Sequence, residues 1–127
     1  YLLEKGLIQL ADRSGERIDL DGFMARARQI ENEFDLKFGV YRDLRNKMMV
    51  VKTGFKFGTH FRVYKSVGGL EKVPHSDFLV HTVPEDHVFF PPVLSRAVRL
   101  AHSVRKEMVF AYPDKDVHYL EIKRLKP

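Results

Sequence analysis

The sequence contains no cysteine, and this absence excludes three kinds of chemistry. A disulfide framework, a zinc site with cysteine ligands and thiol catalysis all need a sulfhydryl group. No run of about 18 apolar residues occurs either, so the sequence predicts no membrane-spanning helix. Since no signal peptide is recognisable, we expect a cytoplasmic protein.

The usual spacings of metal and phosphate sites are also missing. The six histidines are scattered, and no HExxH or comparable pattern occurs. We therefore expect no metal and no cofactor. The run KTGFKFG from Lys52 to Gly58 contains glycines, but it lacks the GxxxxGK[ST] spacing of a phosphate-binding loop and does not lead into a predicted helix. We interpret its glycines as turn residues.

What is present is an ordinary globular composition with an excess of positive charge. The 127 residues are 44% hydrophobic and 31% charged, which predicts one compact domain with a substantial core. The net charge is +5. Such a charge is typical of proteins that bind polyanions such as nucleic acids, although a merely basic protein would show it too.

The chain opens with predicted helices. The first residues, YLLEKG, are typical of a helix that ends at Gly6. Apolar residues then recur at spacings near 3.6 over residues 20–34, which predicts an amphipathic helix capped by Asp19 or Asp21. A second helix is predicted over residues 35–47. Because the chain opens inside a helix and without methionine, we expect it to be truncated at its start.

From residue 48 the pattern changes to strands, which divides the chain into a helical region (1–47) and a second domain (48–127). Strands are predicted over residues 49–53, 59–65, 78–83, 109–112 and 118–125, with a helix over residues 94–106. The order predicts an α/β (α+β) fold with a small mixed β-sheet and packed helices.

Two of these elements carry polar side chains on one face. In the second strand, Phe61 and Val63 alternate with Arg62 and Tyr64, so we expect the first pair in the core and the second pair on the opposite face. The predicted helix from Leu94 to Lys106 has Ser95 as its expected cap. A second group on this helix has spacings of three and four, which predicts one shared face: Arg96, Arg99, His102 and Lys106.

Histidine, lysine and tyrosine side chains can together cleave RNA without a metal ion. Transesterification needs a base for the 2′-hydroxyl, an acid for the leaving 5′-oxygen and a cation for the charge of the transition state. Histidine suits the acid role and lysine the cation role, whereas tyrosine needs nearby positive charge to become a useful base. Each candidate also has an ordinary explanation: Tyr64 as a strand-end aromatic, His75 as a loop residue and Lys106 as a helix C-terminal cation.

Four runs of the sequence together resemble the catalytic subunit, or the catalytic C-terminal half, of archaeal tRNA-splicing endonuclease (tRNA-intron lyase). The runs are VVKTGFKFGTHFRVY, PHSDFLVH, LSRAVRLAHSVRKEMVFA and YLEIKRLKP. The resemblance covers roughly residues 40–127 and makes residues 48–127 the catalytic nuclease domain. It implies a catalytic triad in which Tyr64 is the base, His75 the acid and Lys106 the transition-state stabiliser.

The same resemblance implies a substrate and an assembly. The substrate would be precursor tRNA cut at a bulge–helix–bulge, with 2′,3′-cyclic phosphate and 5′-hydroxyl products. Arg99 and Arg124 would clamp a flipped bulge base. Like subunits would form a homotetramer, a dimer of two-repeat chains or a mixed oligomer, with the loop from Tyr112 to Val117 docked into a neighbour through Asp114 and Asp116.

Two alternatives to a catalytic role remain open. The chain could be a structural or RNA-positioning subunit of the same kind of assembly, with its catalytic residues unused. It could also be a basic binding module unrelated to splicing, but that reading leaves the joint occurrence of the four runs unexplained. The segment from His81 to Pro92, including Phe89 and Phe90, shows the least family pattern, and its role is open between core, interface and a lineage-specific feature.

Overall fold

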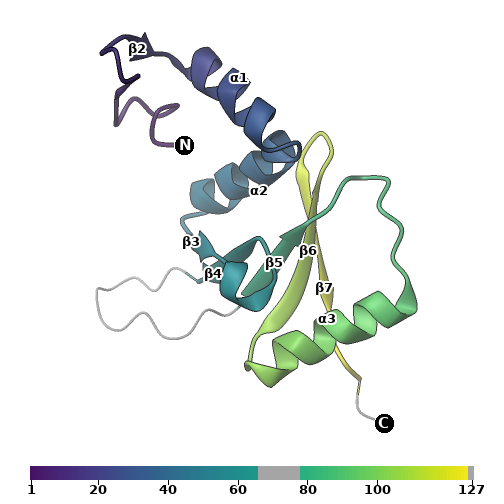
Figure 1. Ribbon diagram of the computed structural model, residues 1–127. Helices are drawn as coiled ribbons and strands as arrows, with labels where there is room; N and C mark the ends of the chain where they lie inside the picture. Colours follow the sequence, from purple (N-terminus) through teal and green to yellow (C-terminus); the bar gives the residue numbers. More distant parts are fainter. Residues whose placement is uncertain (66–77, 126–127) are drawn as a thin grey trace.

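The computed structural model of the protein describes residues 1–65 and 78–125 (Figure 1). In chain order its elements are β1 (Leu10–Ala11), β2 (Arg17–Ile18), α1 (Leu20–Ile30), α2 (Phe34–Asn46), β3 (Val50–Thr53), the 3₁₀ turn η1 (Phe55–Phe57), β4 (Phe61–Tyr64), β5 (Phe78–Thr82), α3 (Pro91–Ser103), β6 (Glu107–Pro113) and β7 (Val117–Ile122). None of the helices in this part of the chain is long and apolar enough to cross a membrane.

The main sheet has five strands in the order β3-β4-β5-β6-β7. Only β5 and β6 run parallel, and α3 makes the connection between them; the other neighbours are antiparallel. β1 and β2 form a separate small hairpin. The mixed sheet with packed helices confirms the predicted α+β fold.

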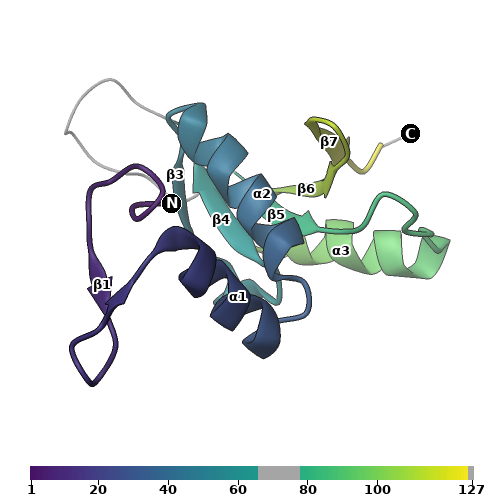
Figure 2. The ribbon, with the colours of Figure 1, turned by 90° about the horizontal axis from the view of Figure 1, so that it is seen from above.

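Helices cover both faces of the sheet, as the two views together show (Figures 1 and 2). On one face, Val40 and Leu44 of α2 pack with Val63, Val80 and neighbouring strand residues. A second cluster lies on the other face under α3, formed by Leu79, Val83, Ala101, Met108 and Phe110. The sheet therefore has an α2 face and an α3 face. The boundary predicted between residues 47 and 48 stays a prediction.

The alternation predicted for β4 is confirmed. Val63 is fully buried and Phe61 packs beside it in the cluster under α2. Tyr64 follows Val63 and therefore projects from the opposite face of the sheet, where it is only 9% exposed. The tyrosine is thus a buried strand residue and not a surface aromatic.

The opening of the chain contains one correction. α1 is capped as predicted, because the Asp19 carboxylate accepts a hydrogen bond from the backbone N–H of Gly22. The helix predicted in YLLEKG, however, is only a single turn. The Lys5 N–H donates to the Tyr1 carbonyl, and Gly6 then ends the turn with a φ of 71°.

The predicted helix over residues 94–106 is displaced toward the N-terminus. α3 begins at Pro91 and its N-cap is Phe90, so the prediction that Ser95 caps it is wrong. Proline suits the first helical positions because the N–H that it lacks has no partner there. The helix ends at Ser103, which leaves Lys106 outside it and makes the predicted helical face shared with Arg99 wrong as well.

A left-handed residue explains the early end of α3. Arg105 has a φ of 58°, and its N–H donates to the carbonyl of His102. The Lys106 N–H donates to the carbonyl of Ala101, which completes the hydrogen-bond pattern of a Schellman motif. Strand β6 starts directly afterwards, at Glu107. Lys106 is therefore fixed between the end of a helix and the start of a strand.

Candidate active site

Two of the three predicted catalytic residues lie at the same end of the sheet. Val63 pairs with Phe78, and Phe78 pairs with Glu107, so these residues form one row across three strands. Tyr64 and Lys106 are each one residue beyond that row, in the same direction. Because they are two strands apart, the spacing of strands puts their α-carbons roughly 10 Å from each other.

The two side chains also share a face. Tyr64 projects from the α3 face of β4, as described above. Lys106 is two residues before Met108, and residues two apart along a strand project from the same face. Met108 belongs to the cluster under α3. Its ammonium lies 5.5 Å from the centroid of the Phe57 ring, and Phe57 packs against that same cluster. Sheet register and helix termination together bring tyrosine and lysine to one site.

The Phe57 ring also contacts a second cation, Arg62. The Arg62 guanidinium carbon lies 6.0 Å from its centroid, and the Arg62 Nε also donates to the backbone carbonyl of Thr53. A ring face attracts cations at such distances through its quadrupole. Phe57 therefore stabilises Lys106 and Arg62 in positions that their own flexible side chains would not fix.

The turn between β3 and β4 depends on two glycines, as predicted, but for different reasons. Gly58 ends the 3₁₀ turn in the left-handed region, with a φ of 70°. At Gly54 a Cβ atom would come within 2.4 Å of the Thr59 hydroxyl and 2.9 Å of the Phe61 backbone. The turn is therefore held tightly against the start of β4, and it directs Phe57 inward.

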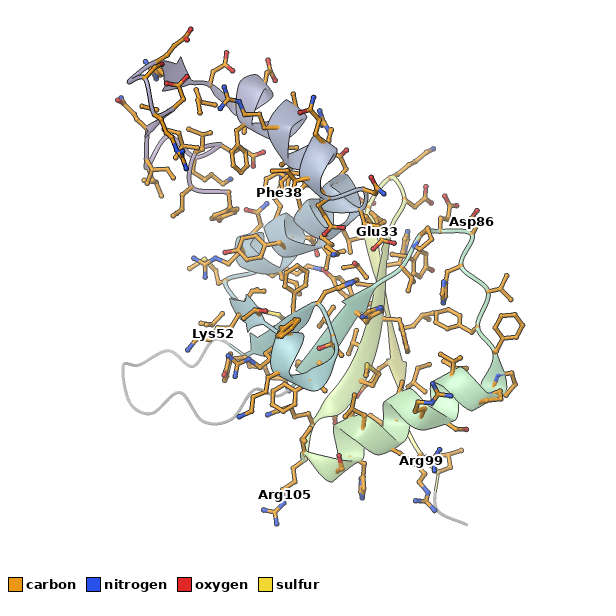
Figure 3. All side chains as sticks on the ribbon, in the orientation of Figure 1. Glu33, Phe38, Lys52, Asp86, Arg99 and Arg105 are labelled. Carbon is orange, nitrogen blue, oxygen red and sulfur yellow. The ribbon has the colours of Figure 1, made fainter. Side chains whose placement is uncertain are left out.

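Positive charge also surrounds Tyr64. The Lys52 ammonium lies 5.7 Å from the centroid of its ring, and Lys52 pairs with Arg62 across β3 and β4. Figure 3 shows Lys52 at this edge of the sheet. The sequence predicted Arg62 on the same face as Tyr64, but the contacts of Lys52 and Phe57 were not predicted, because they depend on register and on the fold of the turn.

His75, the third predicted catalytic residue, lies outside the described residues. It is three residues before Phe78, the first residue of β5. Its position relative to Tyr64 and Lys106 stays a prediction.

The two predicted base-clamping arginines come together in space. Arg99 on α3 and Arg124 beyond the end of β7 line one open pocket of about 390 Å³. The rest of its wall is mostly apolar and consists of Leu94, Ser95, Val98, Ile122 and Lys123. Figure 3 shows Arg99 projecting from α3 on the side of the C-terminal segment. A flat ring with an apolar face and polar edges suits such a pocket.

Two half-buried histidines lie farther along the α3 face. His60 and His81 stack with ring centroids 4.0 Å apart. The backbone N–H of Thr82 donates to Nδ1 of His60, which favours the neutral ring. Burial, together with the neighbouring His81, lowers the pKa of His60 to about 4, and burial also lowers the pKa of His81. No group of three or more potential metal ligands occurs within the described residues.

The predicted docking loop is shorter than expected. Tyr112 and Pro113 belong to β6 and Val117 to β7, so the turn consists of residues 114–116. The Asp114 N–H donates to the Asp116 carbonyl, and both side chains are exposed. In the segment from His81 to Pro92, Phe89 packs edge-to-face on Phe110 of the core, whereas Phe90 is exposed.

Known proteins are similar in sequence to this chain along its whole length. It is 54% identical over 127 residues to a protein named tRNA-splicing endonuclease from Methanococcoides burtonii. The match covers 99% of this chain and 36% of that relative. The protein of the same name from Hyperthermus butylicus is 38% identical over 130 residues, which cover all of this chain and 70% of the relative.

The family model described as "tRNA intron endonuclease, catalytic C-terminal domain" matches residues 34–119. That range includes α2, the complete five-stranded sheet apart from the last residues of β7, and both Tyr64 and Lys106. The chain spans about a third of the length of the first relatives that it matches. The family model and the relatives together show that this chain belongs to the tRNA intron endonuclease family.

Proposed function

We propose that this chain is the catalytic part of an endoribonuclease that removes introns from precursor tRNA. The observation that carries the proposal is the convergence of Tyr64 and Lys106 on one face and one end of the sheet. Membership of the family and the names of the relatives support the substrate class.

The proposed reaction is a transesterification without a metal ion. Tyr64 takes the proton of the 2′-hydroxyl, and the 2′-oxygen attacks the adjacent phosphorus. The bond from phosphorus to the 5′-oxygen breaks, and His75 gives that oxygen a proton. The products are a 2′,3′-cyclic phosphate and a 5′-hydroxyl, and no water is consumed. Lys106 stabilises the negative charge that develops on the phosphoryl oxygens.

The proposed cleavage site is a bulge–helix–bulge. An unpaired nucleotide can leave the helix and adopt the in-line geometry that cleavage needs, whereas a paired nucleotide cannot. The pocket between Arg99 and Arg124 would receive a flipped bulge base, with the guanidinium groups stacked on the faces of the ring.

Product chemistry tests the proposal directly. The full-length protein is incubated with a bulge–helix–bulge RNA with and without EDTA, and the ends of the fragments are identified. We expect equal cleavage in both samples and a cyclic phosphate at each new 3′ end. Loss of cleavage on chelation, or a 3′-hydroxyl product, would contradict the mechanism. His75→Ala should abolish cleavage and leave RNA binding largely intact.

The rival is a structural or RNA-positioning subunit. Under that reading Tyr64→Phe leaves cleavage unchanged in the complete assembly, whereas under our proposal it lowers the rate sharply. We further propose that like subunits assemble and that the exposed turn with Asp114 and Asp116 contributes to the contact. Light scattering of the intact protein and of a variant with both aspartates changed to asparagine measures this, and an unchanged mass would remove the turn from the interface.

A further inference from the structure

Phe55, at the start of the 3₁₀ turn η1, has a ring that is 89% exposed. Burying a phenylalanine normally stabilises a protein by about 2 to 3 kcal/mol, and this ring contributes little of that stabilisation although its turn is ordered. Its neighbour Phe57, two residues on, is directed inward and packs under α3. The turn thus presents one aromatic ring to the protein and the other to solvent.

The turn that carries Phe55 is well held. The Phe55 N–H donates to the Thr53 hydroxyl, and the close approach at Gly54 described above fixes the turn against β4. Gly58 closes it with a hydrogen bond to the Phe55 carbonyl. Binding a ligand on this ring would therefore order little of the protein, which keeps the entropic cost of binding low.

The surroundings of the ring indicate what it would bind. Residues 48–65 contain four lysines and arginines and no aspartate or glutamate. Lys56 is the next residue in the chain, and the ring of Phe57 lies under the cations of Arg62 and Lys106. An exposed apolar ring on a segment of net positive charge suits a flat base on a phosphate chain, and stacking on aromatic side chains is how unpaired bases are commonly held.

We propose that Phe55 is a stacking platform for an unpaired nucleobase of the bound RNA, separate from the pocket of Arg99 and Arg124. The inference rests on the proposed function, because it takes RNA as the ligand. A protein partner is less well matched, since one exposed ring is much smaller than a protein docking surface and acidic residues are absent from this stretch of sequence.

The test measures the affinity of the full-length protein for a bulge–helix–bulge RNA that has 2′-deoxyribose at the cleaved positions and cannot react. Phe55→Ala should weaken binding by about 5- to 150-fold, which corresponds to the usual loss of one stacked base. Phe55→Trp should bind as well as the parent protein or better. The matched control is Phe90→Ala, since Phe90 is also exposed, at 62%, but lies in a stretch without lysine or arginine; it should bind like the parent.

A second arm identifies the base. Each bulge nucleotide in turn is replaced by an abasic residue. At the nucleotide that stacks on Phe55, the abasic RNA should bind the parent protein and Phe55→Ala equally, because the interaction is already lost. At the other bulge positions the loss caused by Phe55→Ala should persist.

The outcomes separate this inference from the proposed function. If the parent protein neither binds nor cleaves the RNA, the proposed function fails. If the parent cleaves normally and Phe55→Ala binds with unchanged affinity, only the platform is overturned. A change in the mass of the assembly by light scattering, with RNA affinity unchanged, would also overturn it and would assign Phe55 to a protein interface.

Discussion

The N-terminal region (residues 1–47) and the basic segments (residues 48–65 and 91–106) differ in how they use charge. Residues 1–47 contain nine acidic and nine basic residues, and four ion pairs form within them: Arg28–Asp35, Lys37–Glu31, Arg42–Glu4 and Lys47–Asp43. The basic segments contain eight lysines and arginines and no aspartate or glutamate. They carry Tyr64 and Lys106.

This comparison shows that the excess positive charge of the protein is concentrated in the basic segments. The N-terminal region is neutral, and its Asp43 carboxylate links α2 to β7 by accepting a hydrogen bond from the Tyr119 hydroxyl. Burial would raise the pKa of Asp43, but the hydrogen bonds from Lys47 and Tyr119 outweigh it and lower that pKa. The basic segments concentrate positive charge where a polyanion would bind. The charges of the N-terminal region are therefore mostly paired, whereas the basic segments carry unbalanced positive charge.

The largest expected effect comes from the basic segments. Lys106→Ala should lower kcat for RNA cleavage by about 100- to 1000-fold, because one group that stabilises developing charge is lost. The free energy of unfolding should change little. The matched control is Lys37→Ala on α2, which removes a cation that pairs with Glu31. Single-turnover cleavage and urea unfolding measure both quantities. Equal losses of kcat in the two variants would contradict a functional difference between the N-terminal region and the basic segments.

Phe57→Leu should lower kcat about tenfold with little change in KM, because the cation–π contact that positions Lys106 is lost. Phe57→Tyr keeps an aromatic face and should restore most of the rate. A purely structural role for Phe57 would instead predict that both variants follow their unfolding free energies. Steady-state kinetics beside urea unfolding distinguishes the two.

Tyr119→Phe should act on stability alone. Its hydroxyl donates to the Asp43 carboxylate, and the Lys47 ammonium lies 4.7 Å from its ring. Removing the hydroxyl should cost about 1 kcal/mol of unfolding free energy, with kcat unchanged. Urea unfolding measures the loss. A drop in kcat at full folding would show that the α2 face also shapes the active site.

The smallest expected effect is a pH dependence of the unfolding free energy, caused by His60 in the basic segments. Folded His60 has a pKa of about 4 against an ordinary value of 6.5, so the unfolded state binds more protons between these values. Stability should therefore be full above pH 6.5 and fall by about 1 kcal/mol as pH is lowered to 4, once solvent screening of this half-buried ring is included. His60→Phe should flatten this part of the profile in urea unfolding at several pH values; an unchanged slope would contradict it.

The sequence predicted several elements that local chemistry decides. The Asp19 cap, the period of α1 and α2, and the alternation of β4 are set by neighbouring residues, and each was found. The end of α3 was missed because Arg105 adopts a conformation that glycine usually signals. The placement of Tyr64 and Lys106 at one end of the sheet depends on register between strands from distant parts of the chain, which no local pattern encodes.

Helices α2 and α3 are both followed by a residue in the left-handed backbone conformation, which costs conformational free energy. Met48 after α2 and Arg105 after α3 both have positive φ, a conformation that disfavours any side chain by about 1 kcal/mol or more. At position 105 a glycine would relieve that strain but would remove the positive charge of Arg105. Figure 3 shows Arg105 projecting from the end of α3, and Lys106 is the next residue in the chain. Under the proposed RNA-binding role, Arg105→Gly would help folding and weaken binding, so selection for thermal stability alone would move this position away from the residue that a polyanion favours.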